Sequence, residues 1–168
     1  LVVMGSLGST SVNAIMKDAL PTVSDRYQIL FVTGKNNYEE MRKQIHAPHI
    51  KVVDYVKQLD IMAHVDLIVC RAGATTAAEI TALGTPSILV PSPYVAHNHQ
   101  FYNASVLVDH KAAVMLEEKD LNAAALSKAI DQIMSDDLLR ASMRSASLAL
   151  GKPNASEDIL NWCDEMKR

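Results

Sequence analysis

Short apolar runs alternate with longer amphipathic segments from the first residue to about residue 115. Several runs consist almost wholly of Val, Ile and Leu, which is typical of strands that are buried on both faces. The expected strands are Leu1–Met4, Tyr27–Thr33, Ile50–Val53, Asp66–Cys70, Ser87–Val90 and Ala112–Met115. The expected helices between them are Ser9–Leu20, Tyr38–Ile45, Gln58–Ala63, Thr75–Leu83 and His99–Val108. This repeated β-then-α order predicts right-handed crossovers and a doubly wound parallel sheet of the α/β class.

After about residue 120 the pattern becomes purely helical. The expected helices there are Leu121–Met134, Asp136–Leu148 and Ser156–Met166. Because no linker or internal repeat interrupts the 168 residues, we expect a single domain spanning residues 1–168. The chain opens in mid-strand without a methionine, so we expect a fragment of a longer protein, with a trimmed amino terminus as the alternative.

Charge and composition exclude some classes of protein. The net charge is −3 and the pI is about 6.1, which argues against a nucleic-acid-binding surface. No apolar run approaches the roughly 18 residues of a membrane span. Of the two cysteines, Cys70 ends an apolar run and is expected to be a small buried side chain, while a disulfide with Cys163 stays open.

The turns that follow strands are the candidate binding sites, because ligands of such sheets bind beyond the carboxyl ends of the strands. The turn Gly5-Ser6-Leu7-Gly8-Ser9 has two glycines, which allow a tight turn and close approach of a ligand. Ser9 or Thr10 is expected to cap the next helix, whose free N–H groups favour a phosphate. The spacing matches neither the dinucleotide nor the ATP-binding glycine motif, so a plain strand-to-helix turn is an equal alternative.

The segment Cys70–Glu79 places small residues and hydroxyls at a second helix start, expected near Thr75. Glu79 lies about one turn into that helix, where a carboxylate can accept hydrogen bonds from the vicinal hydroxyls of a ribose. A glutamate near a helix start is also favoured by the helix dipole alone. On position alone, the dipole is the favoured explanation.

Between Pro91 and Ala104, prolines stiffen the end of a strand and a dense polar set opens a helix. His99 and Asn103 are expected on one helical face, with Gln100 beside them. Amide and imidazole groups both donate and accept hydrogen bonds, which suits sugar hydroxyls. His97 and His99 are weak metal-ligand candidates, since no cysteine or carboxylate cluster accompanies them. A solvated helix start is the alternative for the whole set.

In order and spacing, the segments Met4–Ser9, Cys70–Glu79 and Val90–Ala104 resemble the C-terminal, donor-binding domain of the MurG family of glycosyltransferases. The resemblance covers nearly the whole chain, and the second and third motifs are its specific part. It implies a Rossmann-like half of a two-domain GT-B architecture. It also implies inverting transfer of N-acetylglucosamine (GlcNAc) from UDP-GlcNAc to the lipid-linked muramoyl-pentapeptide precursor, lipid I to lipid II, in peptidoglycan synthesis. Cell wall biogenesis, cell shape and cell division would depend on that step.

The resemblance implies a donor site drawn from several loops. The implied roles are diphosphate contact by Ser6 and the backbone of Gly5 and Gly8, uracil contact by Tyr55 and Val56, phosphate contact by Ala74, Thr75 and Thr76, ribose contact by Glu79, and GlcNAc contact by His99, Gln100 and Asn103. The chain departs from the family pattern at Met4 and Ser9, where glycine and alanine are usual. Some members carry Gln at the position of His99, which makes its sugar contact the least secure.

The family's N-terminal domain is expected to lie outside these residues. In the family it binds the lipid-linked acceptor, meets the membrane and is expected to supply the general base, so the catalytic residues are unknown. This chain alone is therefore expected to bind UDP-GlcNAc without turnover. No Asp-x-Asp motif is present, so we expect no metal or other cofactor for donor binding. The parent enzyme would be cytoplasmic and peripheral on the inner face of the cell membrane.

Two questions stay open at the level of sequence. Ile159, Leu160, Trp162 and Cys163 either face the other domain across the interdomain cleft or belong to the core of this one. The competing functions are another GT-B-type UDP-sugar enzyme, an epimerase or a transferase, and a stand-alone nucleotide-sugar-binding subunit.

Overall fold

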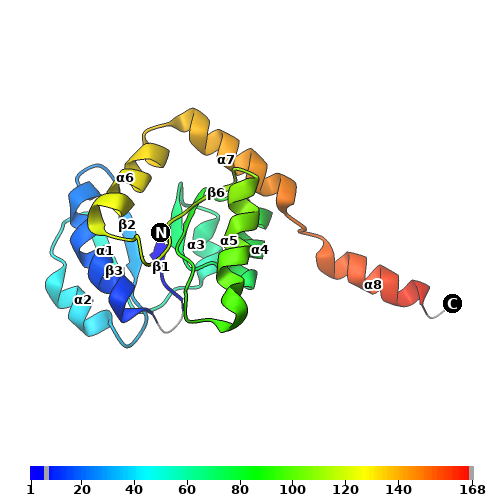
Figure 1. Ribbon diagram of the computed structural model, residues 1–168, viewed down its shortest axis with the longest axis horizontal. Helices are drawn as coiled ribbons and strands as arrows, with labels where there is room; N and C mark the ends of the chain where they lie inside the picture. Colours follow the sequence, from blue (N-terminus) through cyan, green and yellow to red (C-terminus); the bar gives the residue numbers. More distant parts are fainter. Residues whose placement is uncertain (6–7, 167–168) are drawn as a thin grey trace.

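Six parallel strands form one sheet in the order β3-β2-β1-β4-β5-β6 in the computed structural model, which describes residues 1–5 and 8–166 (Figure 1). The strands are β1 Val2–Val3, β2 Ile29–Val32, β3 Ile50–Val53, β4 Ile68–Cys70, β5 Ser87–Leu89 and β6 Ala113–Met115. The chain moves outward from β1 through β2 and β3, and then returns to pair β4 with the other side of β1. The loops after β1 and β4 therefore lie side by side, where ligands of such sheets bind.

Helices cover both faces of the sheet and confirm the predicted doubly wound α/β class. They are α1 Thr10–Val23, α2 Tyr38–Gln44, α3 Gln58–Met62, α4 Ala74–Leu83, α5 His99–Asp109, α6 Ala123–Met134, α7 Asp137–Leu150 and α8 Ala155–Glu165, with a short 3-10 turn at Ala96–Asn98. Side chains of α1, α2 and α6 pack on one face, and those of α3, α4 and α5 pack on the other.

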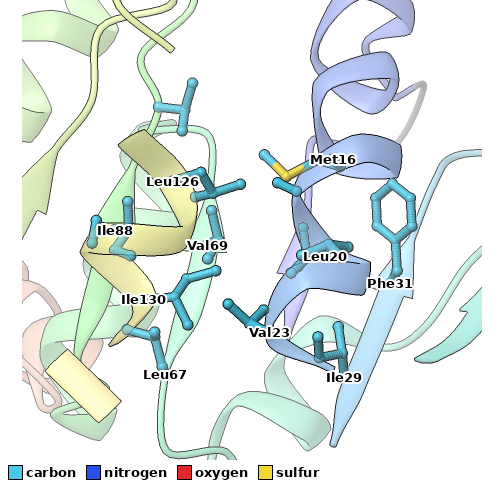
Figure 2. Packing of buried hydrophobic residues seen from close by; sticks show 14 of the residues in the cluster. Met16, Leu20, Val23, Ile29, Phe31, Leu67, Val69, Ile88, Leu126 and Ile130 are labelled. Carbon is cyan, nitrogen blue, oxygen red and sulfur yellow. The ribbon is translucent and has the colours of Figure 1, made fainter. Parts of the chain in front are cut away.

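Alternate residues of each strand enter two separate apolar cores. Val69 and Ile88 join the core beneath α1 and α6, whereas Cys70 and Leu89 join the core beneath α3, α4 and α5. In Figure 2, Leu20 of α1 points toward the α6 side chains above the sheet. Burial on both faces explains why these strands are continuous apolar runs in the sequence.

The first helix is longer than predicted. We expected it to end at Leu20, before a proline, but α1 continues through Pro21 to Val23. Proline removes one intrahelical hydrogen bond. Val23 is only 1% exposed in the core, and burying a side chain of this size is worth about 1.5–3 kcal/mol, which offsets much of that loss.

The last two helices differ in how they join the body. Helix α7 lies against α4, where Ser147 Oγ donates to the carbonyl of Ile80 at 3.2 Å. Helix α8 projects away from the rest of the molecule, and none of its residues is buried (Figure 1). Ile159, Leu160 and Trp162 are 57%, 65% and 62% exposed. The alternative that they form this domain's own core is therefore wrong.

Candidate functional site

The loop after β1 is shaped by two glycines in the left-handed region. Gly5 has φ +85° and Gly8 has φ +74°, and the N–H of Gly8 donates to the carbonyl of Gly5 at 3.1 Å. A Cβ on Gly8 would lie 2.1 Å from the carbonyl oxygen of Thr33, at the end of β2, so only glycine fits there. Gly5 has open space around it. Ser6, expected to contact a diphosphate, lies outside the described residues.

Ser9 stands at the start of α1 with an extended backbone, as a capping residue should. Within residues 1–5 and 8–166, however, its side chain makes no capping hydrogen bond, so the predicted cap is wrong for Ser9. Thr10 does not replace it, because its Oγ1 donates to Asn37 Oδ1 at 3.0 Å. Ser9 does not cap the helix because its side chain makes a tertiary contact instead: Arg71 Nη2 donates to Ser9 Oγ at 3.0 Å.

A cavity of about 390 Å³ opens at the carboxyl ends of β1, β2 and β3. It brings together four predicted site residues, Gly5, Tyr55, Val56 and Glu79, which come from three separate loops and helices. Tyr55 is 61% exposed, and Val56 is half-buried. The lining of the cavity therefore includes the aromatic side chain of Tyr55 and the aliphatic side chain of Val56, both in one loop, and the carboxylate of Glu79 from α4.

Glu79 lies beyond the reach of the helix dipole. Helix α4 begins at Ala74 with Gly73 as its N-cap, which makes Glu79 the sixth residue rather than one of the first turn. Dipole stabilisation falls off within the first turn, so the explanation favoured on position alone is wrong. Gln58 Nε2 approaches Glu79 Oε2 at 3.5 Å, a marginal hydrogen bond that leaves the carboxylate capacity to accept others.

The start of α4 also lacks a side-chain cap among the described residues. Ala74 and Thr75 are exposed and Thr76 is half-buried. Because β4 pairs with β1, this helix start lies next to the glycine loop. Two helix N-termini without side-chain caps among the described residues thus lie after neighbouring strands at the same edge of the sheet, an arrangement that favours an anion.

The loop after β5 ends in two left-handed residues, His97 at φ +54° and Asn98 at φ +51°. Such conformations cost on the order of 1–3 kcal/mol for residues other than glycine and cluster at functional sites. The loop is held by Gln100, whose Oε1 accepts a hydrogen bond from the N–H of Ser92 at 2.9 Å. The donor end of that amide, Nε2, is not used in this bond.

The other two polar residues of this loop have different surroundings. Asn103 Nδ2 donates to the carbonyl of Ala72 at 3.0 Å and so ties α5 to the loop after β4. His99 is exposed, with Nδ1 2.9 Å from the carbonyl oxygen of Ala96 in its own turn. The predicted set of three is therefore divided: Gln100 and Asn103 brace the loops, while His99 stands at the surface.

Sequence reasoning missed a half-buried ion pair beside these loops. Arg71 Nη1 lies 2.8 Å from Glu118 Oε2, and the two side chains are only 12% and 11% exposed. Glu118 follows β6, so its place after a strand was the available signal. Gln58, which contacts Glu79, was also missed, although it follows β3 in the same way.

A larger cavity, of about 530 Å³, opens at the opposite, amino-terminal edge of the sheet. Leu1, Ile29, Ile50 and Leu67 contribute to its lining, and none of the predicted site residues that the structure describes does. Since ligands of parallel sheets bind at the carboxyl edge, the smaller cavity is the candidate site.

Other chemistry is sparse in the part of the chain that the structure describes. No group of three or more His, Cys, Asp or Glu side chains there is arranged to hold a metal ion. Both cysteines are free, and burial raises the pKa of the Cys70 thiol to about 12. No described helix combines the length and the hydropathy needed to cross a bilayer.

A glycine loop, two helix starts without side-chain caps among the described residues, and a carboxylate at the switch point suit a ligand that carries phosphate and hydroxyl groups. Residues 1–159 match the Glycosyltransferase family 28 C-terminal domain, and the chain belongs to this family.

The relatives point to one enzyme within the family. The chain is 42% identical, over 93% of its length, to the UDP-N-acetylglucosamine--N-acetylmuramyl-(pentapeptide) pyrophosphoryl-undecaprenol N-acetylglucosamine transferase of Limosilactobacillus reuteri, and covers 44% of that protein. The enzyme of the same name from Lactiplantibacillus plantarum is 42% identical over 96% of the chain, which covers 46% of it. The chain thus spans about half the length of the curated relatives it matches.

Solved structures agree with this assignment. MurG of Acinetobacter baumannii superposes with a TM-score of 0.87 at 25% identity, over 98% of this chain and 49% of that one. The glycosyltransferase VinC, at a TM-score of 0.73 and 16% identity over 98% of this chain and 41% of that one, shares the fold alone. The resemblance and the fold class expected from the sequence are therefore confirmed.

Proposed function

We propose that this chain is the donor-binding domain of a MurG-type transferase, which binds UDP-GlcNAc for transfer to a lipid-linked muramoyl-pentapeptide. The observation that carries the proposal is the cavity at the switch point, where Gly5, Tyr55, Val56 and Glu79 meet. The 42% identity to curated enzymes of that name supports the choice of donor and acceptor. The alternatives of another UDP-sugar enzyme or a stand-alone binding subunit have no comparable support.

The nucleoside part of the donor occupies the cavity. Its volume of about 390 Å³ lies at the lower end of the usual range for ligand pockets, which suits a uridine rather than the whole donor. Uracil lies against Tyr55 and Val56, and the ribose hydroxyls donate to the carboxylate of Glu79. A charged acceptor strengthens such hydrogen bonds relative to neutral ones.

The diphosphate lies between the starts of α1 and α4. Ser6 and the backbone of Gly5 and Gly8 contact it from one side, and the turn Ala74–Thr76 contacts it from the other. Neither helix has a side-chain cap among the described residues, which leaves this end of each helix to an anion. The same two dipoles stabilise the charge that UDP gains as it leaves, so no metal is required.

The GlcNAc lies against the start of α5. Gln100 presents its Nε2 donor, which takes no part in the bond to Ser92, and Asn103 presents its Oδ1 acceptor. His99 contributes from the surface. In the transfer step an acceptor hydroxyl oxygen forms a bond to the anomeric carbon while the bond from that carbon to UDP breaks. The electron pair leaves with UDP, the configuration inverts, and the hydroxyl proton passes to a general base on another domain.

That other domain also binds the lipid-linked acceptor and makes the membrane contact of a peripheral enzyme on the cytoplasmic face. The exposed apolar side chains of α8, Ile159, Leu160 and Trp162, support a place for this helix against it. The net charge of −3 supports the proposal that the chain has no nucleic-acid partner.

Calorimetry and a transfer assay test the proposal together. The chain should bind UDP-GlcNAc more tightly than UDP-glucose or GDP-mannose, and it should transfer no GlcNAc to a lipid-linked acceptor. Equal affinity for all three nucleotide sugars would refute the proposal that UDP-GlcNAc is the donor. Turnover by this chain alone would refute the expected need for a second domain.

A further inference from the structure

Glu118 lies outside the proposed donor site, yet it touches residues at its edge. It follows β6, and its Oε2 contacts Arg71 Nη1 at 2.8 Å while its Oε1 accepts from Ser11 Oγ at 3.0 Å. Arg71 in turn donates to Ser9 Oγ at 3.0 Å and to the carbonyl of Val90 at 3.1 Å. One half-buried ion pair thereby links the carboxyl ends of β4, β5 and β6 to the start of α1.

The hydrogen bonds of this group run in one direction. Ser11 uses its proton toward the carboxylate, so in its 3.3 Å contact with Ser9 the Ser9 hydroxyl is the donor. The order is guanidinium to Ser9, Ser9 to Ser11, and Ser11 to Glu118, and the 2.8 Å charge contact closes the ring. Linked bonds of this kind polarise one another and hold a single geometry.

The ring explains why Ser9 does not cap α1. Its oxygen accepts from Arg71 and its proton goes to Ser11, so the side chain is held away from the helix amides. Ser9 directly follows Gly8, whose place is set by the close approach to Thr33. The ring therefore fixes the helix-side end of the glycine loop and keeps the start of α1 open.

We propose that Glu118 is a positioning residue for the diphosphate: through Arg71 and Ser11 it holds Ser9 off the helix start that receives the phosphates. This inference rests on the proposed function, since it assigns Glu118 to the same donor. A buried ion pair is weak evidence for stability in itself, because desolvation offsets much of the attraction. Its position at the glycine loop gives it a role in binding.

The test compares UDP with uridine, which lacks the phosphates but should occupy the same cavity. Replacing Glu118→Ala should weaken UDP binding about tenfold and change uridine binding less than about twofold, measured by calorimetry and NMR titration. Ser11→Ala breaks the ring on an exposed helix position without leaving a buried charge, so it should fold normally. It should weaken UDP about threefold and leave uridine unchanged.

The matched control is Glu117→Ala, which removes the neighbouring exposed pair with Lys119 and should leave both affinities unchanged. Equal loss of UDP and uridine in the Glu118→Ala chain would make the ion pair merely structural and overturn the proposal. Tighter UDP binding would also overturn it, because Arg71 would then be reaching the phosphates once released. If the unaltered chain binds uridine and UDP equally well, the phosphates contribute nothing to binding. That result would refute the proposed diphosphate site, and with it the role of Glu118.

Discussion

Replacing Glu79→Ala separates recognition of ribose from stability of the fold. In the proposed complex the carboxylate accepts hydrogen bonds from two ribose hydroxyls, each worth about 1.5 kcal/mol because the acceptor is charged. The sum, about 3 kcal/mol, corresponds to roughly a hundredfold loss of UDP affinity. The folded chain itself loses little, since its described contact to Glu79 is the 3.5 Å approach of Gln58 and the residue lies beyond the first turn of α4.

Calorimetry with UDP and with 2′-deoxy-UDP tests the geometry directly. The unaltered chain should bind UDP about tenfold more tightly than the deoxy ligand, because one hydroxyl is missing. In the Glu79→Ala chain the two ligands should bind alike, since no carboxylate remains to distinguish them. The matched control is Glu40→Ala, which removes a similar glutamine–glutamate contact of 3.2 Å on α2, outside the cavity.

The refuting result is specific. If the Glu79→Ala chain still prefers UDP to 2′-deoxy-UDP by the original factor, another group reads the ribose and the placement of the nucleoside in the cavity is wrong. A fall in unfolding free energy well above about 0.5 kcal/mol, with UDP affinity unchanged, would show that Glu79 supports the fold instead, through its contact with Gln58.

Three further experiments test other parts of the structure. Gln100→Ala should weaken binding of UDP-GlcNAc roughly fivefold and leave binding of UDP unchanged, whereas Asn103→Ala should weaken binding of both ligands, because it also releases the carbonyl of Ala72. If calorimetry gives the two variants the same pair of affinities, this division of roles is wrong. In urea denaturation, Gly8→Ala should lower the unfolding free energy by about 2 kcal/mol or more, and Gly5→Ala, which has the same sign of φ but open space around it, by only about 1 kcal/mol. Equal losses would mean that the backbone shifts to relieve the contact between the new Cβ and Thr33. Because burial raises the pKa of Cys70 to about 12, iodoacetamide at pH 8 should label Cys163 alone in the native chain and both cysteines in denaturant. Mass spectrometry counts the labels, and labelling of Cys70 in the native chain would contradict its burial.

The elements of the sheet could be predicted because their cause is local in the sequence. Ile68, Val69 and Cys70 alternate between two buried faces, so the run has to be apolar throughout. Ser9 shows the limit of that reasoning. Its residue type and its place before a helix both favour a cap, yet its partner, Arg71, lies 62 positions away in the chain. Local pattern carries no information about such a contact.

Glu79 shows the opposite case, in which the structure strengthens a sequence hypothesis. The sequence predicts a helix start near Thr75, and position alone favours a dipole effect as the role of the carboxylate. The backbone starts the helix one residue earlier, at Ala74, and puts Glu79 beside the cavity with Gly5, Tyr55 and Val56. Sequence identifies the residue type, whereas the convergence of three loops depends on the strand order.

The nucleotide and sugar parts of the proposed site share their supports. Asn103 holds the loop after β4, which leads into the helix that carries Glu79, and Arg71 in that same loop holds Ser9 beside the glycine loop. A change at the start of α5 can therefore reach the diphosphate through Ala72 and Arg71, without touching the ligand itself. It follows that substitutions in this domain cannot be sorted by distance from the ligand alone. The ligand pair used in the assay, UDP against UDP-GlcNAc or UDP against uridine, decides which part of the site a residue serves.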